Sequence, residues 1–374
     1  MLKSFYHNLR HFGFLIVSNL FRTINFKRVD KMNVESNENC EGTPSNMAQP
    51  SVNTVNTVNA VNAVNSVDTV NDKGLDGKEF FELCNNPALV FSFETHKKFD
   101  ALSIDNNNSP LDLFISNTKQ LHLLRSSGIT TTLGHLLLLG YVSAAESYLR
   151  ALIRNLINHD EYIQSIVSDK TVSYAAAHHH KKELLPEALL EDFSLASPYN
   201  VFETLKDIIG MKGQRPSEMI KCSSEFMKVC ELRHCCVHRF GKLGSKNAIR
   251  LGLAEHREHL EKPILLNDED LEQIAFIVEN FVRTLNNTIF KFIMNRTAEN
   301  KNKEKAGERF YDSEWTWIFE QDRERFCKYY KIFSTSNDTL PGLSLEDSYR
   351  LFVNFYKPNP PARRNKKDGE SYVS

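Results

Sequence analysis

The chain has 374 residues and a mass of 43.0 kDa, which leaves room for about two or three domains. Hydrophobic residues make up 41% and charged residues 25%, the proportions of an ordinary soluble protein. With 46 Lys and Arg against 47 Asp and Glu, the net charge is -1. This balance excludes a histone-like or ribosomal-tail protein, so any contact with nucleic acid must come from a local basic patch.

The number of cysteines indicates whether the protein resides in an oxidising or a reducing compartment of the cell. The chain contains seven cysteines, an odd number, and no secretory cleavage pattern is evident. In a chain of this size, that combination favours a reducing environment. We therefore expect a cytoplasmic protein.

Residues 1–30 form a basic amphipathic segment, in which Asp30 is the first acidic residue. Its longest uncharged run, between Arg10 and Arg22, has about 11 residues, whereas a membrane span needs about 20. A membrane-surface helix, a targeting segment and a helix docked on the body are the alternatives. We do not expect membrane contact through residues 1–28.

The next two segments show little regular periodicity. Residues 52–71 repeat Val-Asn-small with a period of three, which fits neither a helix nor a strand. Residues 31–75 are therefore predicted to be a disordered low-complexity linker. Residues 76–129 are predicted to be an irregular region that docks onto a core, because clustered phenylalanines are followed by an Asn-rich turn.

Residues 130–298 carry the strongest helical pattern. Apolar residues in 134–158 recur at spacings of three and four, as on one face of an amphipathic helix. They are Leu138, Val142, Ala145, Leu149, Leu152 and Leu156. Further helices are predicted over 200–211, from Ser217 through Leu232, and after Asn267 as N-cap. Strand-like alternation is scarce, so we predict an all-α fold with a bundle of four or five helices.

The C-terminal part is rich in aromatic residues. Residues 308–357 contain both tryptophans and are predicted to be a small appendage that packs on the bundle, with a helix over 344–355. A polar linker over 300–307 precedes it, and residues 358–374 are predicted to be a basic disordered tail.

The densest group of chemically capable residues lies in 231–239. Arg233 and His238 are five positions apart, and the polar His234 directly follows the arginine. This pattern resembles the motif of the HEPN family, the "higher eukaryotes and prokaryotes nucleotide-binding" helical domains. The context is similar too, because glycines follow the histidine and residues 141–149 look like the first core helix of that family. The resemblance covers about residues 130–298 and neither the N-terminal region nor the aromatic appendage.

The resemblance implies a metal-independent endoribonuclease without a cofactor, which cleaves RNA by attack of the 2′-hydroxyl on the adjacent phosphate. His238 would be the general acid or base, Arg233 would bind the scissile phosphate, and His234 would orient the site or contact RNA. It also implies a toxin or antiviral-defence effector, with an antitoxin or regulatory partner. HEPN nucleases form homodimers whose two motifs share one cleft.

Helical geometry constrains this site. Five residues on an ideal helix turn by about 500°, so Arg233 and His238 would point about 140° apart, with about 7.5 Å between them along the axis. One rigid helix would not bring them to one phosphate. We therefore expect either a helix that begins or kinks within 235–237, or a site shared by two chains.

The motif spacing alone is weak evidence, because it occurs a second time at Arg154 and His159. Arg154 continues the first helix and no third helix precedes it. We therefore favour Arg233 and His238 as the functional pair.

Three other interpretations remain open. His234 and His238, with Cys230 one turn earlier, could hold a structural zinc ion. The bundle could also be a non-catalytic RNA-binding, nucleotide-binding or dimerisation module. Glu146 either assists the active site or forms a helix-surface pair with Arg150.

Overall fold

The computed structural model describes residues 91–103, 108–298, 315–339 and 342–357. The predicted N-terminal segment, low-complexity linker, polar linker and basic tail lie outside these residues. The chain divides into two units, Met1–Glu94 and Thr95–Ser374. The described helices belong to the second unit.

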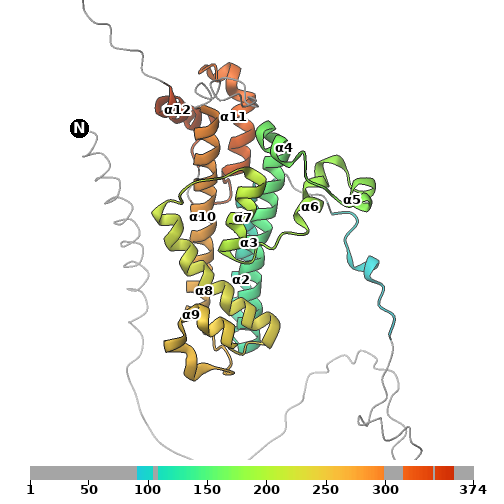
Figure 1. The fold of residues 1–374 in the computed structure, drawn as a ribbon, viewed down its shortest axis with the longest axis vertical. Coiled ribbons are helices and arrows are strands. Elements are labelled where there is room, and N and C mark those ends of the chain that lie inside the picture. The colour runs from blue at the N-terminus through green and yellow to red at the C-terminus, as the bar shows by residue number, and fades with distance from the viewer. Residues whose placement is uncertain (1–90, 104–107, 299–314, 340–341, 358–374) are drawn as a thin grey trace, which may run out of the picture. The chain divides into compact units, whose positions relative to one another are not determined.

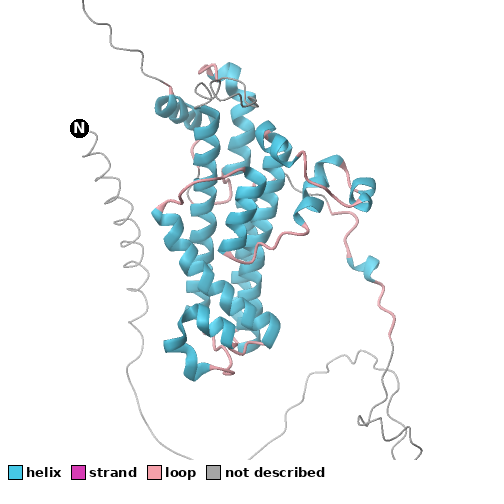
Figure 2. Ribbon diagram, in the orientation of Figure 1, coloured by secondary structure: helices cyan, strands magenta, loops and turns pink. Residues whose placement is uncertain are grey.

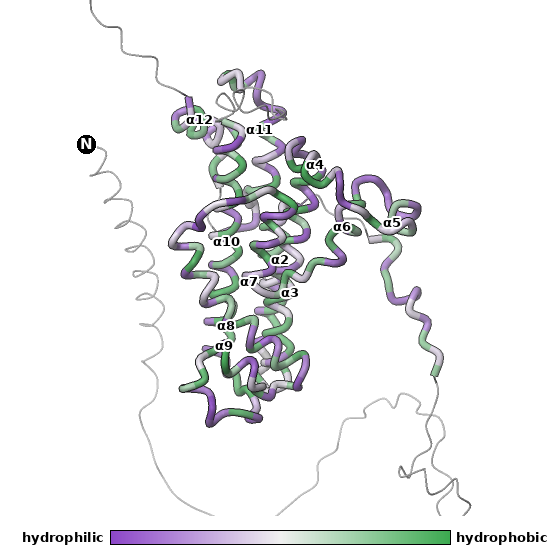
Figure 3. The backbone as a smooth tube through the Cα atoms, in the orientation of Figure 1, coloured by the Kyte–Doolittle hydropathy of each residue, from purple (hydrophilic) through white to green (hydrophobic). Residues whose placement is uncertain are grey.

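The prediction of an all-α fold is confirmed for the described residues. Figure 2 shows helices and loops, and the described part of the chain forms no strand. One isolated backbone bridge joins Lys242 to Pro263. The trace in Figure 3 alternates between apolar and polar along the long helices, as expected for amphipathic helices that pack together.

Four helices form the centre of the unit: α2 (Pro110–Leu124), α3 (Thr131–His159), α8 (Ser217–Arg239) and α10 (Asp268–Ala298). α2 packs on α3, α8 packs on α10, and α3 also contacts both α8 and α10 (Figure 1). Stacked rings of Phe226 and Phe281, with centroids 4.1 Å apart, join α8 to α10. Buried Tyr148 on α3 donates to Asn286 of α10 at 3.1 Å.

The ends of the long helices follow the predicted signals. Asn267 caps α10 as predicted, because its side chain accepts from the amide of Asp270 at 2.8 Å. The Asp270 carboxylate accepts from the Asn267 amide at 2.9 Å, which completes a reciprocal cap. α3 is the one helix in the described ranges that is long and apolar enough to cross a membrane, but 61% of its most apolar window is buried in the bundle. That burial is typical of a core helix.

The expectation of an irregular region over 76–129 is wrong for residues 110–124, which form α2. Ser109 caps this helix by accepting from the amide of Asp112 at 3.0 Å, and Pro110 occupies the first turn. Only a short stripe, Leu111, Phe114 and Ile115, is buried apolar surface. Such a short stripe gives too little periodicity to reveal a helix from the sequence.

Short helices connect α3 to α8, so the expected number of four or five helices was too low. They are α4 (Glu161–Val167), α5 (Tyr174–His179), α6 (Leu185–Leu190) and α7 (Pro198–Thr204), with a π-helical turn over Leu205–Ile209. Segments of six or seven residues are too short to show a helical period. α7 and the π-turn together occupy the segment predicted as one helix over 200–211.

The aromatic C-terminal segment shares the core of the bundle. It contains α11 (Phe319–Phe333) and α12 (Leu345–Tyr356), and α11 contacts α2, α3 and α10. Phe326 of α11 and Phe352 of α12 belong to the same buried cluster as the bundle helices. The described part of this segment therefore packs against the bundle, as a predicted appendage would, and its buried side chains belong to the same core.

Candidate functional site

The sequence motif lies on one unbroken helix. α8 runs from Ser217 to Arg239 and includes Arg233, His234 and His238. The first alternative, a helix that begins or kinks within 235–237, is therefore wrong. On this continuous helix Arg233 and His238 point about 140° apart, as the ideal geometry requires.

Arg233 continues the stripe of α8 that faces the core. Cys230, about one turn earlier on this stripe, is 1% exposed, and Phe226, about two turns earlier, is 0% exposed. Arg233 itself is half-buried, and its guanidinium makes no ion pair or hydrogen bond with any described residue. A full set of donors at the edge of the bundle is thus available to an anionic ligand.

His234 and His238 lie together on another face of α8. Their ring centroids are 6.2 Å apart, and His238 is exposed. His234 is more protected, and its Nδ1 lies 3.8 Å from a carboxylate oxygen of Glu231. The two histidines are therefore close together, and on an ideal helix His234 and His238 point about 100° and about 140° away from Arg233.

Glu231 is a buried carboxylate that sequence reasoning missed. It accepts from Asn247 Nδ2 at 2.8 Å and from Arg250 Nη1 at 2.9 Å, both on α9 (Ser245–His256). It thereby fixes α9 beside the two histidines and places a second arginine close to them. Its position three residues before His234 indicates that the two side chains are neighbours on a helix. Its partners Asn247 and Arg250 come from a different helix, so the sequence does not reveal them.

The turn after His238 has a clear steric requirement. Phe240 ends α8 with φ 51°, and Gly241 follows with φ 89°. A Cβ atom on Gly241 would lie 2.3 Å from Cε1 of His135 on α3, too close for any side chain. His135 Nε2 lies 3.0 Å from the carbonyl oxygen of Ile264. The glycine thus lets the end of α8 sit directly against α3.

The second copy of the spacing is occupied by local contacts. Arg154 Nη1 lies 3.1 Å from Glu187 of α6. His159 Nδ1 lies 2.8 Å from the carbonyl oxygen of Asn155, within its own helix. Both side chains of the second copy are thus engaged by neighbouring residues of the described chain.

The geometry gives no support to a zinc site. Cys230 is buried, with 1% of its surface exposed, and burial raises the pKa of its thiol to about 12, whereas His238 is exposed on the helix surface. Among the residues that the structure describes, no three His, Cys, Asp or Glu side chains are arranged to hold a metal ion.

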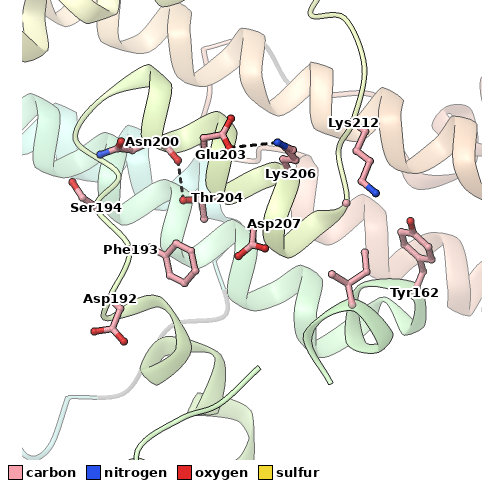
Figure 4. Close-up of a pocket in the computed structure, with 12 residues that line it drawn as sticks. Tyr162, Asp192, Phe193, Ser194, Asn200, Glu203, Thr204, Lys206, Asp207 and Lys212 are labelled. Atoms are coloured by element: carbon pink, nitrogen blue, oxygen red, sulfur yellow. Dashed lines mark hydrogen bonds and ion pairs between the residues drawn. The ribbon is translucent and has the colours of Figure 1, made fainter. Parts of the chain in front are cut away.

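Three cavities in the described part of the chain have no residue of the 231–239 motif in their linings. Figure 4 shows one of about 740 Å³, lined by residues of α7 and the π-turn, where Lys206 pairs with Glu203 at 3.6 Å. Glu146 of α3 lines a smaller cavity of about 370 Å³ with Arg150. Arg150 donates to the carbonyl oxygens of Leu190 and Phe193, and its expected pair with Glu146 is absent from this part of the chain.

Comparisons with protein-family models, with curated proteins and with solved structures find no match to this chain.

Proposed function

We propose that this protein is a metal-independent endoribonuclease of the HEPN type that acts as a homodimer. The observation that supports this most is the arrangement of α8. It presents Arg233, which pairs with no described residue, and the exposed His238 on one unbroken helix. The resemblance of the motif supplies the chemistry, and with it the expectation of a cytoplasmic toxin or defence effector that has an antitoxin or regulatory partner.

The reaction requires only groups of this kind. The 2′-hydroxyl of RNA loses its proton to a base and attacks the adjacent phosphorus, and the 5′-oxygen leaves with a proton from an acid. His238 suits the proton transfers, because an imidazole titrates near neutral pH. Arg233 binds the phosphate oxygens, and His234 orients the site or contacts RNA. The products are a 2′,3′-cyclic phosphate and a 5′-hydroxyl.

A second copy of the chain completes the site. Since Arg233 and His238 of one helix diverge, one phosphate is reached by both only when a two-fold axis brings another α8 alongside. Apolar side chains are exposed around this end of α8: Phe240 at 82%, Ile249 at 63% and Val237 at 46%. Phe240 is held at positive φ by the end of α8, and its exposed ring adds to an apolar patch of the kind that marks a protein–protein contact.

Substituting Phe240 with aspartate should weaken the dimer at least tenfold, because it places a charge in the apolar contact. Asp also tolerates a positive φ better than Phe, so the fold of the monomer should be retained. Light scattering over a dilution series measures the effect. Phe355→Asp is the matched control, since Phe355 is 70% exposed on α12. A wild-type monomer at micromolar concentration, or a Phe240→Asp dimer as tight as wild type, would contradict the proposal.

The proposed activity is tested by incubating the full chain with a structured RNA pool in EDTA and mapping the new ends. We expect cleavage that leaves cyclic-phosphate and 5′-hydroxyl ends. Protein with His238→Ala, purified identically, controls for contaminating nuclease. Binding of RNA without cleavage would instead support the non-catalytic module, and cleavage that EDTA abolishes would rule out the metal-independent mechanism.

A further inference from the structure

A groove of about 770 Å³ lies at the N-terminal end of α8, far from the motif. α7, the π-turn, the loop over 210–216 and α10 form its walls. Phe202, Met211 and Phe292 supply apolar surface, and Thr288 and Asn287 supply polar groups. Its volume is within the range of small-molecule sites, and the mixture of apolar walls with a few polar groups is typical of them.

Positive charge gathers in this groove from three parts of the chain. Lys206 comes from the π-turn, Lys212 and Arg215 from the following loop, and Lys291 from α10. Lys206 is paired with Glu203. The other three make no ion pair with any residue in the described ranges, although Glu218 also lines the groove. All three are exposed to solvent, and with Lys206 they outnumber Glu203 and Glu218 in the lining, so the groove has a positive field that attracts an anion.

Arg215 is held in place by an aromatic ring. Its Cζ lies 4.2 Å from the ring centroid of Phe202, which is 9% exposed and part of the core. Stacking of this kind orients the guanidinium and leaves its N–H donors free at the edge. An arginine presented in this way suits the oxygens of a phosphate group.

We propose that this groove binds a small organic phosphate. The phosphate would lie against Lys212, Arg215 and Lys291, and the organic part against Met211 and Phe292. The positive end of the α8 dipole adds to the same field. A neutral or cationic ligand would gain no attraction from this positive field.

The groove is independent of the proposed nuclease site. The groove lies at the start of α8, and Ser217 and Arg233 are 16 positions apart on this helix, a rise of about 24 Å. No residue of the 231–239 motif lines the groove. The inference therefore does not depend on the proposed endoribonuclease activity.

The proposal is tested by titrating the full-length protein with ADP, pyrophosphate and inorganic phosphate. Calorimetry measures the affinity for each ligand, and thermal melting measures the change in the melting midpoint. We expect ADP to bind and to raise the melting midpoint, since a ligand that binds the native state stabilises it. Adenosine, which lacks phosphate, should bind at least tenfold more weakly. Arg215→Ala and Lys212→Ala should each lower the affinity for ADP at least tenfold.

Lys221→Ala is the matched control, because Lys221 is an exposed cation on α8 that does not line the groove. Its affinity for ADP should equal that of wild type. Lys291→Ala should weaken the binding of ADP as well. Because Lys291 lies on α10, a different wall of the groove, its effect cannot come from local misfolding of the 210–216 loop. The proposal is overturned if none of the three phosphates binds at millimolar concentration. It is also overturned if adenosine binds as well as ADP, or if the groove variants bind like wild type.

Discussion

Replacing His238 with alanine should lower the rate constant of RNA cleavage by about 10²–10⁴-fold, the usual contribution of a general acid or base. The same change should alter the free energy of unfolding by no more than about 0.5 kcal/mol, because His238 is exposed and makes no hydrogen bond with a described residue. Single-turnover cleavage and urea denaturation of the same preparations measure the two quantities. A large loss of rate at constant stability is what separates a catalytic histidine from a structural one.

The second copy of the spacing supplies the matched control. His159 is also an exposed histidine at the end of a helix, five residues after an arginine, but the arginine is paired with Glu187. His159→Ala should therefore keep the wild-type rate. Full activity in His238→Ala, or loss of activity in His159→Ala, would contradict the assignment of the catalytic histidine to α8. Arg233→Lys should retain part of the rate, since it keeps the charge and loses the forked donors.

The long helices could be predicted from the sequence because their apolar stripes persist over many turns. The stripe from Leu138 to Leu156 lies on α3, and the Asn267 cap begins α10 as predicted. α2 could not be predicted in this way, because only three apolar side chains mark its buried face. Its stability comes from tertiary contacts, including buried Asp112, which accepts from the amide of Asn337 at 2.9 Å.

The candidate site was predictable only in part. The placement of Arg233, His234 and His238 on helical faces follows from their spacing alone. The sequence does not show that α8 continues unbroken through the motif. Where the helix ends depends on the turn after it, and in that turn Gly241 packs against His135 of another helix. The burial of Glu231 could not be predicted either. In a helical sequence a buried acid cannot be distinguished from a surface acid, and only the fold places Asn247 and Arg250 beside this one.

The free energy of unfolding should fall by about 3–5 kcal/mol when Asp160 is replaced with alanine, the usual cost of removing one partner of a buried ion pair. Asp160 is 0% exposed, and its carboxylate accepts from Arg296 Nη1 and from the hydroxyl of Tyr329, both at 3.0 Å. It also caps α4 through the amide of Ile163 at 2.9 Å. One side chain therefore joins the α3–α4 junction to α10 and α11.

Arg296 explains why the loss should be so large. Its side chain is only 6% exposed, and its Cζ lies 4.5 Å from the ring centroid of Tyr162. Without Asp160 a buried guanidinium loses its counter-charge, and the aromatic ring compensates only a small part. Urea denaturation followed by circular dichroism measures the change, and the transition midpoint should shift without a change in slope. Asp268→Ala is the control, because Asp268 forms a surface pair with Arg125 and should contribute no more than about 1 kcal/mol. Equal losses in the two variants would show that burial of the Asp160 pair does not govern the stability of the bundle.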